Sequence, residues 1–217
     1  MSVKVAGSFS HELPVTSGVP QGSVLGPILF LLYVNHVTND LKCSFKVFAD
    51  DIKLYIGFGF GEHEEYVSEC QSDIDRLVSV SSSWGLNMNA NKCKVIRFSS
   101  RNSNIPFSGP SPFKINNSCI NFVHSHSDLG VTVDRTLKFH SHIAKNVAIA
   151  GNLTTNLLSC TICRSSEFLI NLYTSHVRPK MEYCSSLWNT GYIGDCKLLE
   201  SIQRRWMREI VGMVAHS

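Results

Sequence analysis

The sequence KCSFKVFADDIKLYIGF, residues 42–58, places two adjacent aspartates between two runs rich in apolar residues. Phe45, Val47 and Ala49 fall on one face of an extended chain, with Lys46, Phe48 and Asp50 on the other, and Ile52, Leu54 and Ile56 then alternate with Lys53 and Tyr55. This two-residue period is typical of β-strands that bury one face. Asp50 and Asp51 interrupt it. The stretch therefore predicts a β-hairpin with an acidic tip.

Two adjacent carboxylates at a hairpin tip indicate a metal ion. Neighbouring negative charges oppose each other's ionisation unless a cation lies beside them, and Mg²⁺ prefers carboxylate oxygens. Turn residues can direct both side chains toward one point, which neighbours within a strand cannot do. In two-metal phosphoryl transfer the ions lie about 3.5–4 Å apart and stabilise the attacking and leaving oxygens. An isolated Asp-Asp pair is more often only a polar turn, so the metal-site interpretation depends on the neighbouring segments.

The segment before the hairpin combines a glycine-containing loop with an apolar helix. The loop is SGVPQGS, residues 17–23, and VLGPILFLLYV, residues 24–34, follows it. Gly26 stands at the expected N-cap, with Pro27 at the first helical position, where a missing N–H costs nothing. The helix predicted over 28–37 is apolar nearly all round, so we expect it to be buried on most sides. The apolar run is about half the ~20 residues that cross a bilayer, so no membrane partner is expected.

The remaining sequence first mixes strands and helices and then becomes helical. A helix predicted over 62–84 ends at Gly85, a residue suited to a helix C-terminus. The other predicted elements are two extended pieces within 3–15 around Gly7-Ser8, a strand over 95–98, a loop over 99–112, a hairpin over 113–123 turned at Asn116-Asn117, a strand over 129–133, and helices over 141–159, 166–175 and 195–211. The last helix has an apolar stripe of Leu198, Ile202, Trp206 and Ile210. We predict an α+β fold, with an antiparallel sheet and helices on one of its faces over 1–135, followed by an all-helical region over 136–217.

Composition and cysteine spacing describe an ordinary folded chain. Hydrophobic residues make up 43% and charged residues 17%, unlike a disordered sequence. The net charge of +3 is compatible with a polyanionic partner without indicating one. Cys160 and Cys163 form a single C-x-x-C without the second pair of a zinc site. We expect reduced cysteines that pack as small apolar residues, and an intracellular location, nuclear or cytoplasmic, rather than secretion. The expected packed cysteines are Cys43, Cys70, Cys93 and Cys119.

Several segments resemble the reverse transcriptases of non-LTR (LINE-type) retrotransposons. FADD, residues 48–51, resembles the F/Y-x-D-D motif, and SGVPQGSVLGP, residues 17–27, is similar to the Pro-Gln-Gly segment of that family. GLNMN, residues 85–89, followed by Lys92, resembles the segment after the palm helix. LGV, residues 129–131, with Asp134, resembles the hairpin that leads into the thumb. The likeness follows the family's order along nearly the whole chain, so it implies a partial polymerase palm over 1–135 and a thumb-like region over 136–217.

The resemblance implies an RNA-directed DNA polymerase, which transfers nucleotides to a primer 3′-OH with Mg²⁺. Its partners would be an RNA template, a DNA primer and a dNTP. Asp50 would coordinate catalytic Mg²⁺, and Asp51 would assist at the same site. The residues implied to contact the template base and the incoming nucleotide are Gly18, Pro20, Gln21, Gly22 and Phe48.

The resemblance implies functional roles for Lys92 and for three arginines of the last predicted helix, and exposure to solvent without such a role is an equally open alternative for each. Lys92 would act at the pyrophosphate end as a cation or proton donor, or be a solvated loop lysine. Arg204, Arg205 and Arg208 would follow a nucleic-acid backbone as a thumb helix does. Because Glu200 and Glu209 share that helix, a merely solvated face is as good an interpretation.

Two departures from the family pattern shape the functional expectation. The family's first catalytic Asp precedes the Pro-Gln-Gly loop, whereas residues 1–16 contain only one carboxylate, Glu12. We therefore expect a chain that begins partway through the palm and polymerises poorly or not at all alone, since a third metal-binding carboxylate is missing. His36 stands where the family usually has Asp. The alternative is a non-catalytic retroelement remnant that at most binds nucleic acid, while a metal nuclease would not explain the Pro-Gln-Gly segment.

Overall fold

A computed structural model describes residues 2–14, 18, 22–57, 59, 63–98, 109–163, 165–189 and 191–214. Helices and small sheets make the protein α+β, as expected. The chain divides into two compact units, unit 1 with residues 1–92 and 112–120, and unit 2 with residues 93–111 and 121–217. The palm and thumb assignment, with its boundary near 135, stays a prediction.

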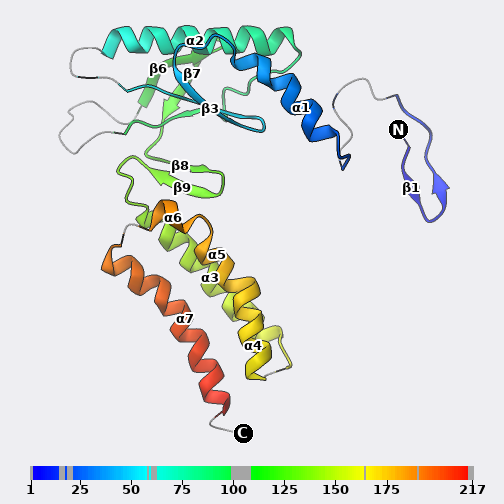
Figure 1. The fold of residues 1–217 in the computed structure, drawn as a ribbon, viewed down its shortest axis with the longest axis vertical. Helices are drawn as coiled ribbons and strands as arrows, with labels where there is room; N and C mark the ends of the chain where they lie inside the picture. Colours follow the sequence, from blue (N-terminus) through cyan, green and yellow to red (C-terminus); the bar gives the residue numbers. More distant parts are fainter. Residues whose placement is uncertain are drawn as a thin grey trace. The chain divides into compact units, whose positions relative to one another are not determined.

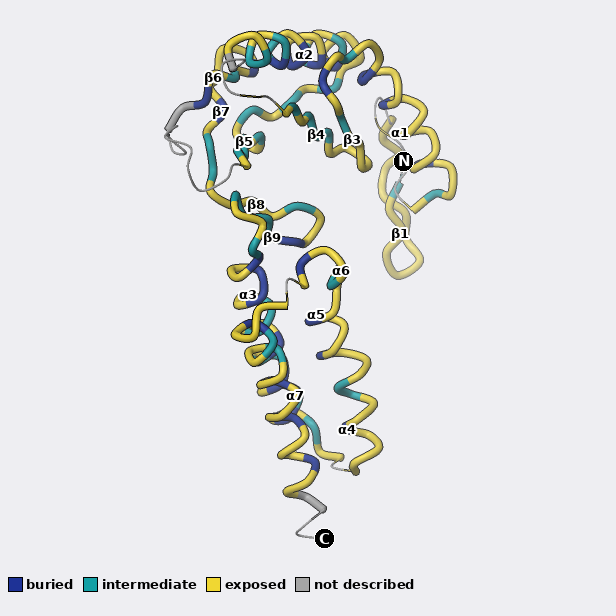
Figure 2. The backbone as a smooth tube through the Cα atoms, turned by 60° about the vertical axis from the view of Figure 1, so that its left-hand side comes forward, coloured by how far each residue is buried: buried dark blue, intermediate teal, exposed yellow. Residues whose placement is uncertain are grey.

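Unit 1 is built from hairpins and two helices. Its elements are β1 (Lys4–Val5), β2 (Ser8–Phe9), α1 (Gly26–Asn35), the 3₁₀ turn η1 (His36–Thr38), β3 (Ser44–Phe48), β4 (Asp51–Tyr55), α2 (His63–Ser83) and most of the hairpin of β6 (Gly109–Ile115) and β7 (Ser118–Phe122). In Figures 1 and 2, α2 lies along one side of the β3–β4 and β6–β7 hairpins. The first hairpin turns at Ala6 and Gly7, with φ angles of 47° and 88°, one residue earlier than predicted.

Helix α2 confirms the predicted amphipathic helix. Its buried face contains Cys70, Ile74, Leu77 and Ser81, which follow the three- and four-residue steps of the sequence. After the helix, Leu86 N–H donates to Ser81 C=O at 2.8 Å and Gly85 N–H donates to Ser82 C=O at 3.0 Å. These two bonds and the φ of +74° at Gly85 form a Schellman motif, so Gly85 ends the helix as predicted.

The β6–β7 hairpin confirms one prediction and corrects another. Asn116 and Asn117 have φ angles of 48° and 65°, the positive values that a type I′ turn requires. The loop predicted over 99–112 is wrong for 109–112, which begins β6, while 99–108 lie outside the described residues. The N–H of Lys114 points away from β7 and donates to Gln71 Oε1 at 2.9 Å. Because N–H directions alternate along a strand, the backbone nitrogens of Pro110 and Pro112 also face away from β7. Because β6 is an edge strand, the missing proline N–H groups remove no bond of the sheet.

Helix α1 forms as predicted, but the prediction that it is buried on most sides is wrong. It begins at Gly26 with Leu25 as N-cap, one residue earlier than expected, because Ser23 Oγ accepts the Gly26 N–H at 3.0 Å. Only Gly26 and Val34 are buried, and Figure 2 shows α1 largely in the exposed colour. The apolar residues that remain exposed are Ile28, Leu29, Leu31, Leu32 and Tyr33. The apolar composition of α1 shows that the helix could bury its side chains, but it does not show which other segments would pack against them. Among the described residues, no helix is long and apolar enough to span a bilayer.

Unit 2 has short strands followed by packed helices. Its elements are β5 (Lys94–Val95), β8 (Ser125–Asp128), β9 (Val131–Asp134), α3 (His140–Cys160), α4 (Ser166–Leu172), the π-helical turn η2 (Tyr173–Val177), α5 (Arg178–Glu182), α6 (Ser185–Trp188) and α7 (Ile193–Val214). β5 pairs in parallel with Asn121 and Phe122 of β7 and is shorter than the predicted 95–98 strand. β9 begins at Val131 rather than at Leu129, because Leu129 and Gly130 form its turn with β8 at φ angles of 45° and 85°.

The helices of unit 2 enclose an apolar core. Figure 1 shows α3 and α7 side by side, with α4 and α5 along them. Trp206, Ile202 and Ile210 of α7 are buried, but Leu198 is 45% exposed, so the predicted stripe is wrong at its first position. The core residues are Ala150, Leu158, Leu169, Val177, Met181, Ile202, Trp206 and Ile210. The helix predicted over 166–175 widens into η2, because Pro179 lacks an N–H and its ring crowds the carbonyl four residues earlier.

Candidate active site

The acidic tip forms where the sequence predicts it. β3 and β4 pair antiparallel in five registered pairs, from Ser44 opposite Tyr55 to Phe48 opposite Asp51. Ala49 and Asp50 make the two-residue turn, and Ala49 has a φ of 52°. A two-residue turn leaves no slack between the strands, so the positions of both aspartates follow from the register of the hairpin.

The side chains at this tip are open to solvent. Asp50 and Asp51 are exposed, and the Phe48 ring is 61% exposed. Two exposed carboxylates supply hard oxygen donors, the kind Mg²⁺ takes together with water ligands. Among the described residues, no group of three or more His, Cys, Asp or Glu side chains could hold a metal ion. The donors present fit Mg²⁺ in kind, and the tip supplies two of them.

The glycines of the preceding loop owe their identity to backbone conformation. Gly18 and Gly22 have φ angles of +82° and +81°, which residues with a Cβ rarely adopt. Nothing lies within 4 Å of a Cβ built at either position. Pro20 and Gln21 lie outside the described residues. The predicted contact of this loop with the template base and the incoming nucleotide therefore stays a prediction.

Lys92 ends the turn that follows α2. Its backbone N–H donates to Asn89 C=O at 3.1 Å, and Asn89 Oδ1 accepts the Asn91 N–H at 3.1 Å. The Lys92 side chain is exposed. Its amine is thus carried on a hydrogen-bonded turn and is open to solvent, which suits both the pyrophosphate role and the solvated alternative.

His36 belongs to an aromatic cluster that the motif comparison missed. Its ring stacks on Trp84, with centroids 5.8 Å apart and planes at 23°. Tyr33 contacts the same indole edge-on at 4.9 Å, and its hydroxyl donates to Trp84 C=O. Tyr33 and His36 are three positions apart on one helical face, the sequence signal for a shared contact. An imidazole thus has a packing role here that the family's Asp would not have.

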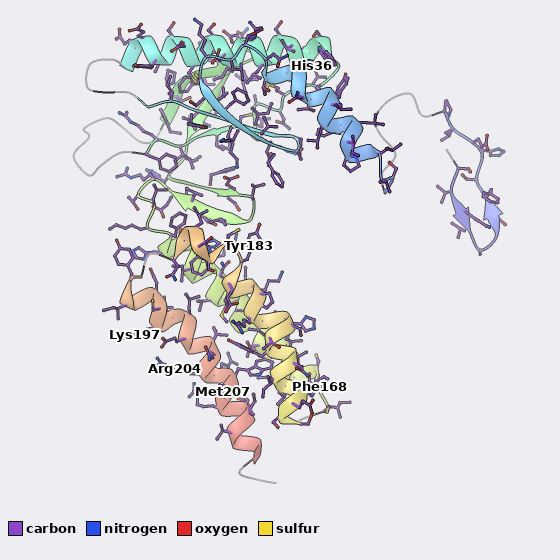
Figure 3. All side chains as sticks on the ribbon, viewed as in Figure 1. His36, Phe168, Tyr183, Lys197, Arg204 and Met207 are labelled. Atoms are coloured by element: carbon purple, nitrogen blue, oxygen red, sulfur yellow. The ribbon has the colours of Figure 1, made fainter. Side chains whose placement is uncertain are left out.

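The arginines of α7 point in different directions. Arg204 pairs with Glu200 one turn away, and Arg208 Nε donates to Arg204 C=O at 3.4 Å. Arg205 instead reaches Thr155 Oγ1 of α3 at 3.1 Å. Lys197 lies two turns before Arg204, and both appear along α7 in Figure 3. The exposed basic stripe of α7 therefore contains Lys197, Arg204 and Arg208, with Arg205 beside it, and the seven-residue spacing could have identified Lys197.

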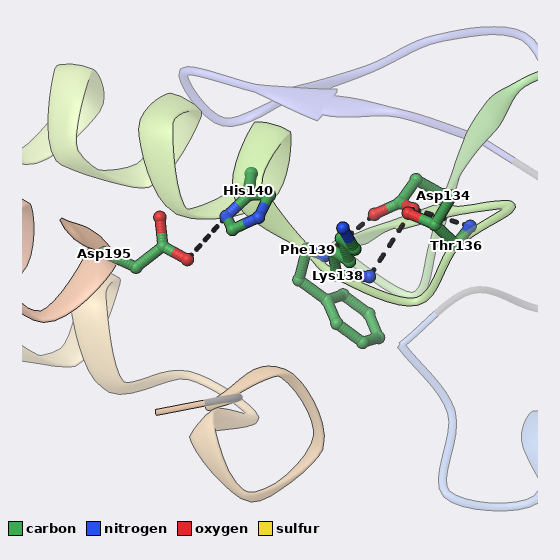
Figure 4. A network of polar contacts seen from close by, with 6 residues as sticks. All are labelled: Asp134, Thr136, Lys138, Phe139, His140 and Asp195. Carbon is green, nitrogen blue, oxygen red and sulfur yellow. Dashed lines mark hydrogen bonds and ion pairs between the residues drawn. The ribbon is translucent and has the colours of Figure 1, made fainter. Parts of the chain in front are cut away.

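A polar network fixes the N-terminus of α3 in unit 2 (Figure 4). Asp134 accepts the N–H groups of Thr136 and Phe139, each at 2.8 Å, and the Thr136 hydroxyl. Burial alone would raise the pKa of Asp134, but these hydrogen bonds and one from the Lys138 N–H outweigh it, so the pKa is lowered. His140 Nδ1 lies 2.6 Å from Asp195 Oδ2 and thereby links the first turns of α3 and α7. Asp134, one of the residues that resemble the family pattern, thus stabilises the turn that leads into α3.

The chain belongs to the reverse transcriptase family. The family described as "Reverse transcriptase (RNA-dependent DNA polymerase)" matches residues 2–139. This region carries the FADD tip, the glycine loop and Lys92, and members of this family use divalent metal, a nucleic-acid template and primer, and dNTPs. The match confirms the resemblance drawn from the motifs.

Relatives in mobile elements extend the similarity into the helical region. The chain is 25% identical over 222 residues to "RNA-directed DNA polymerase from mobile element jockey" of Drosophila melanogaster, covering 97% of this chain and 23% of that protein. It is 25% identical over 227 residues to "Probable RNA-directed DNA polymerase from transposon X-element" of the same species, with 97% and 23% covered. These relatives support a reverse transcriptase of the non-LTR type, and the chain spans about a quarter of their length. No solved structure matches the chain.

Proposed function

We propose that the chain is the part of an RNA-directed DNA polymerase that presents two metal-binding carboxylates to the growing primer. The observation that carries the proposal is the tip itself, where a two-residue turn between registered strands leaves Asp50 and Asp51 exposed at consecutive positions. Both side chains would hold Mg²⁺. The bound ion would neutralise the negative charge that develops during nucleotidyl transfer.

The other residues would bind and orient the substrates. The exposed Phe48 ring would give the template–primer an apolar surface beside the carboxylates, since bases stack on aromatic rings. Gly18 and Gly22 would set the backbone of a loop that also includes Pro20 and Gln21 and lies against the incoming nucleotide. Lys92 would attract the triphosphate and could give a proton to the leaving pyrophosphate.

Charge distribution supports a nucleic-acid role for unit 2. It contains 13 Lys and Arg against seven Asp and Glu, whereas unit 1 contains seven against ten. A positive excess attracts phosphates, and the stripe of Lys197, Arg204 and Arg208 would track the backbone of the template–primer. We propose that unit 2 forms part of the thumb-like region and unit 1 part of the palm.

Primer extension tests the chemical part of the proposal. The chain, an RNA template, a DNA primer, dNTPs and Mg²⁺ are incubated with wild type, Asp50→Asn and, as a matched charge control, Asp40→Asn. We expect little extension by the wild type, because two carboxylates leave the metals short of ligands, and none by Asp50→Asn. Extension that persists in Asp50→Asn would contradict the metal role, whereas robust extension abolished by it would contradict only the expected weakness.

Salt-dependent binding separates a phosphate-contacting role of the α7 arginines from a merely solvated face. Binding to an RNA–DNA duplex is measured by fluorescence anisotropy at several salt concentrations. Loss of one phosphate contact in Arg208→Ala should lower the slope of log K against log salt by about 0.9. Glu209→Ala, a charge change on the neighbouring residue, should not lower it. An unchanged slope in Arg208→Ala would favour a merely solvated face.

A further inference from the structure

Asp73 is a buried carboxylate that neither the motif comparison nor the proposed chemistry uses. It lies on the strand-facing side of α2 and is only 3% exposed. Its Oδ2 accepts the backbone N–H groups of Lys42 at 2.9 Å and Cys43 at 2.6 Å. Burying a charge is costly unless hydrogen bonds compensate for lost water, so this carboxylate is committed to the backbone just before β3.

The contacts of Cys43 strengthen the same junction. The Cys43 thiol is buried, and burial, together with its hydrogen bond to the Asp73 side chain, raises its pKa well above the usual range. The thiol therefore stays protonated beside the carboxylate. Asp73 accepts the two backbone N–H groups of Lys42 and Cys43. Charge-assisted bonds of this kind are shorter and stronger than neutral ones.

A second contact from α2 reaches the same segment but is weaker. Arg76 Nη2 lies 2.5 Å from Asp40 Oδ2, with the two side chains 45% and 76% exposed. Exposed ion pairs contribute little because solvent screens them and their side chains lose freedom. Asp73 is therefore the main polar connection between α2 and the chain that enters β3.

The hairpin beyond this junction has little support of its own. β3 and β4 form a sheet of two strands, and an isolated two-stranded hairpin is marginally stable in water. Cys43 immediately precedes Ser44, the first residue of β3, and only the two-residue turn separates the far end of β3 from β4. A change in backbone direction at the start of β3 therefore moves the tip, because the two paired strands move together.

We propose that Asp73 is a positioning residue for the acidic tip, and that its carboxylate fixes the direction in which the β3–β4 hairpin presents Asp50 and Asp51. This inference rests on the proposed metal role of the tip. Asp73 does not touch the metal or the substrates. It acts through the backbone of Lys42 and Cys43 on the strand that leads to the carboxylates.

The test measures metal affinity in the full chain with Asp73 neutralised. Mn²⁺, which takes the same oxygen ligands as Mg²⁺, is titrated by electron paramagnetic resonance into wild type, Asp73→Asn and Asp75→Asn. Asp75→Asn is the matched control, since it makes the same chemical change on the exposed side of α2. Ile74→Val, at a buried position of the same helix, controls for a general loss of stability. All titrations are made where circular dichroism shows each variant folded.

We expect Mn²⁺ affinity to fall on the order of 10-fold in Asp73→Asn, as for residues that orient metal ligands, and to stay unchanged in both controls. Amide hydrogen exchange should accelerate from Lys42 through Phe48 in the same variant but not along α2. Unchanged affinity in Asp73→Asn, or an equal loss in Ile74→Val, would overturn the positioning role while leaving the metal role of the tip in place. A wild type whose Mn²⁺ binding is absent, or insensitive to Asp50→Asn, would instead overturn the proposed function and the positioning role with it.

Discussion

His142 of α3 is a buried side chain that holds the β8–β9 hairpin against the helix. Its Nδ1 accepts the Thr132 N–H at 3.1 Å, and its Nε2 faces the Asn146 amide at 2.9 Å. Trp188 covers the ring edge-on at 5.6 Å. A ring whose Nδ1 accepts a backbone hydrogen bond has to be neutral there. His142 is thus a structural histidine.

The stability of unit 2 should depend on the protonation of His142. Burial, and then the nearby Lys145 cation, lowers the pKa of His142. The unfolded chain therefore binds more protons, so the unfolding free energy should fall as pH drops below about 6.5, toward the lowered folded-state value. Urea unfolding at pH values between 5 and 8 measures this. His142→Asn keeps an acceptor and should be less stable at pH 8 but less sensitive to acid; an equal pH dependence in both proteins would contradict this assignment.

The cysteines should differ sharply in reactivity, because the structure places them differently. Hydrogen bonds to Ser165 lower the pKa of the exposed Cys163, whereas burial raises the pKa of Cys43 and Cys70. Since the thiolate is the reactive form, iodoacetamide at pH 7 should modify Cys163 first. Cys43 and Cys70 should react only after unfolding. Mass spectrometry of peptides over time measures the order, and Ser165→Ala should slow the reaction of Cys163. The prediction that Cys119 packs in the core is wrong. Cys119 lies on the exposed face of β7, whereas its neighbour Ile120 faces the buried side.

At the scale of elements, helix α7 depends on one aromatic residue. Trp206 is 1% exposed and its Nε1–H donates to Leu169 C=O at 3.1 Å, joining α7 to α4. Trp206→Phe should lower the unfolding free energy by about 1–3 kcal/mol, because the buried carbonyl loses its partner. Met207→Ala, one residue along and 46% exposed, should change it by less than about 0.5 kcal/mol. Chemical denaturation of both variants tests the contrast, and equal losses would show that the indole contact is not what holds the two helices.

The elements that could be predicted from sequence are those whose own residues determine them. α2 has an apolar stripe and a glycine at its end, the β6–β7 turn has two Asn residues with positive φ, and the acidic hairpin has a run with a two-residue period on either side of Asp50 and Asp51. β8 was missed because SHSD, residues 125–128, has no apolar alternation. The burial of α1 was wrong because it depends on other segments. Asp73 was missed for a related reason: its partners are backbone amides 30 residues away, which no local pattern reveals.

At the level of the whole molecule, the two units carry opposite net charge. Unit 1 presents the carboxylates and is net acidic, while unit 2 is net basic and is built on a helical core. A metal ion bound at the tip would offset part of the negative charge of unit 1 and let it approach a polyanion. Nucleic-acid binding should therefore be stronger with Mg²⁺ than with EDTA at equal ionic strength. Anisotropy titrations measure this, and Asp50→Asn together with Asp51→Asn should remove the difference.

The proposed function depends on metal binding by Asp50 and Asp51 at the hairpin tip. Backbone amide spectra of the full chain recorded with increasing Mn²⁺ test it most directly, because the ion broadens the signals of nuclei close to it. We expect selective broadening of the signals of residues 47–53 at the lowest Mn²⁺ concentrations, and its loss when both aspartates are replaced by asparagine. Broadening that begins elsewhere in the chain, or that persists around the tip in the double variant, would contradict it.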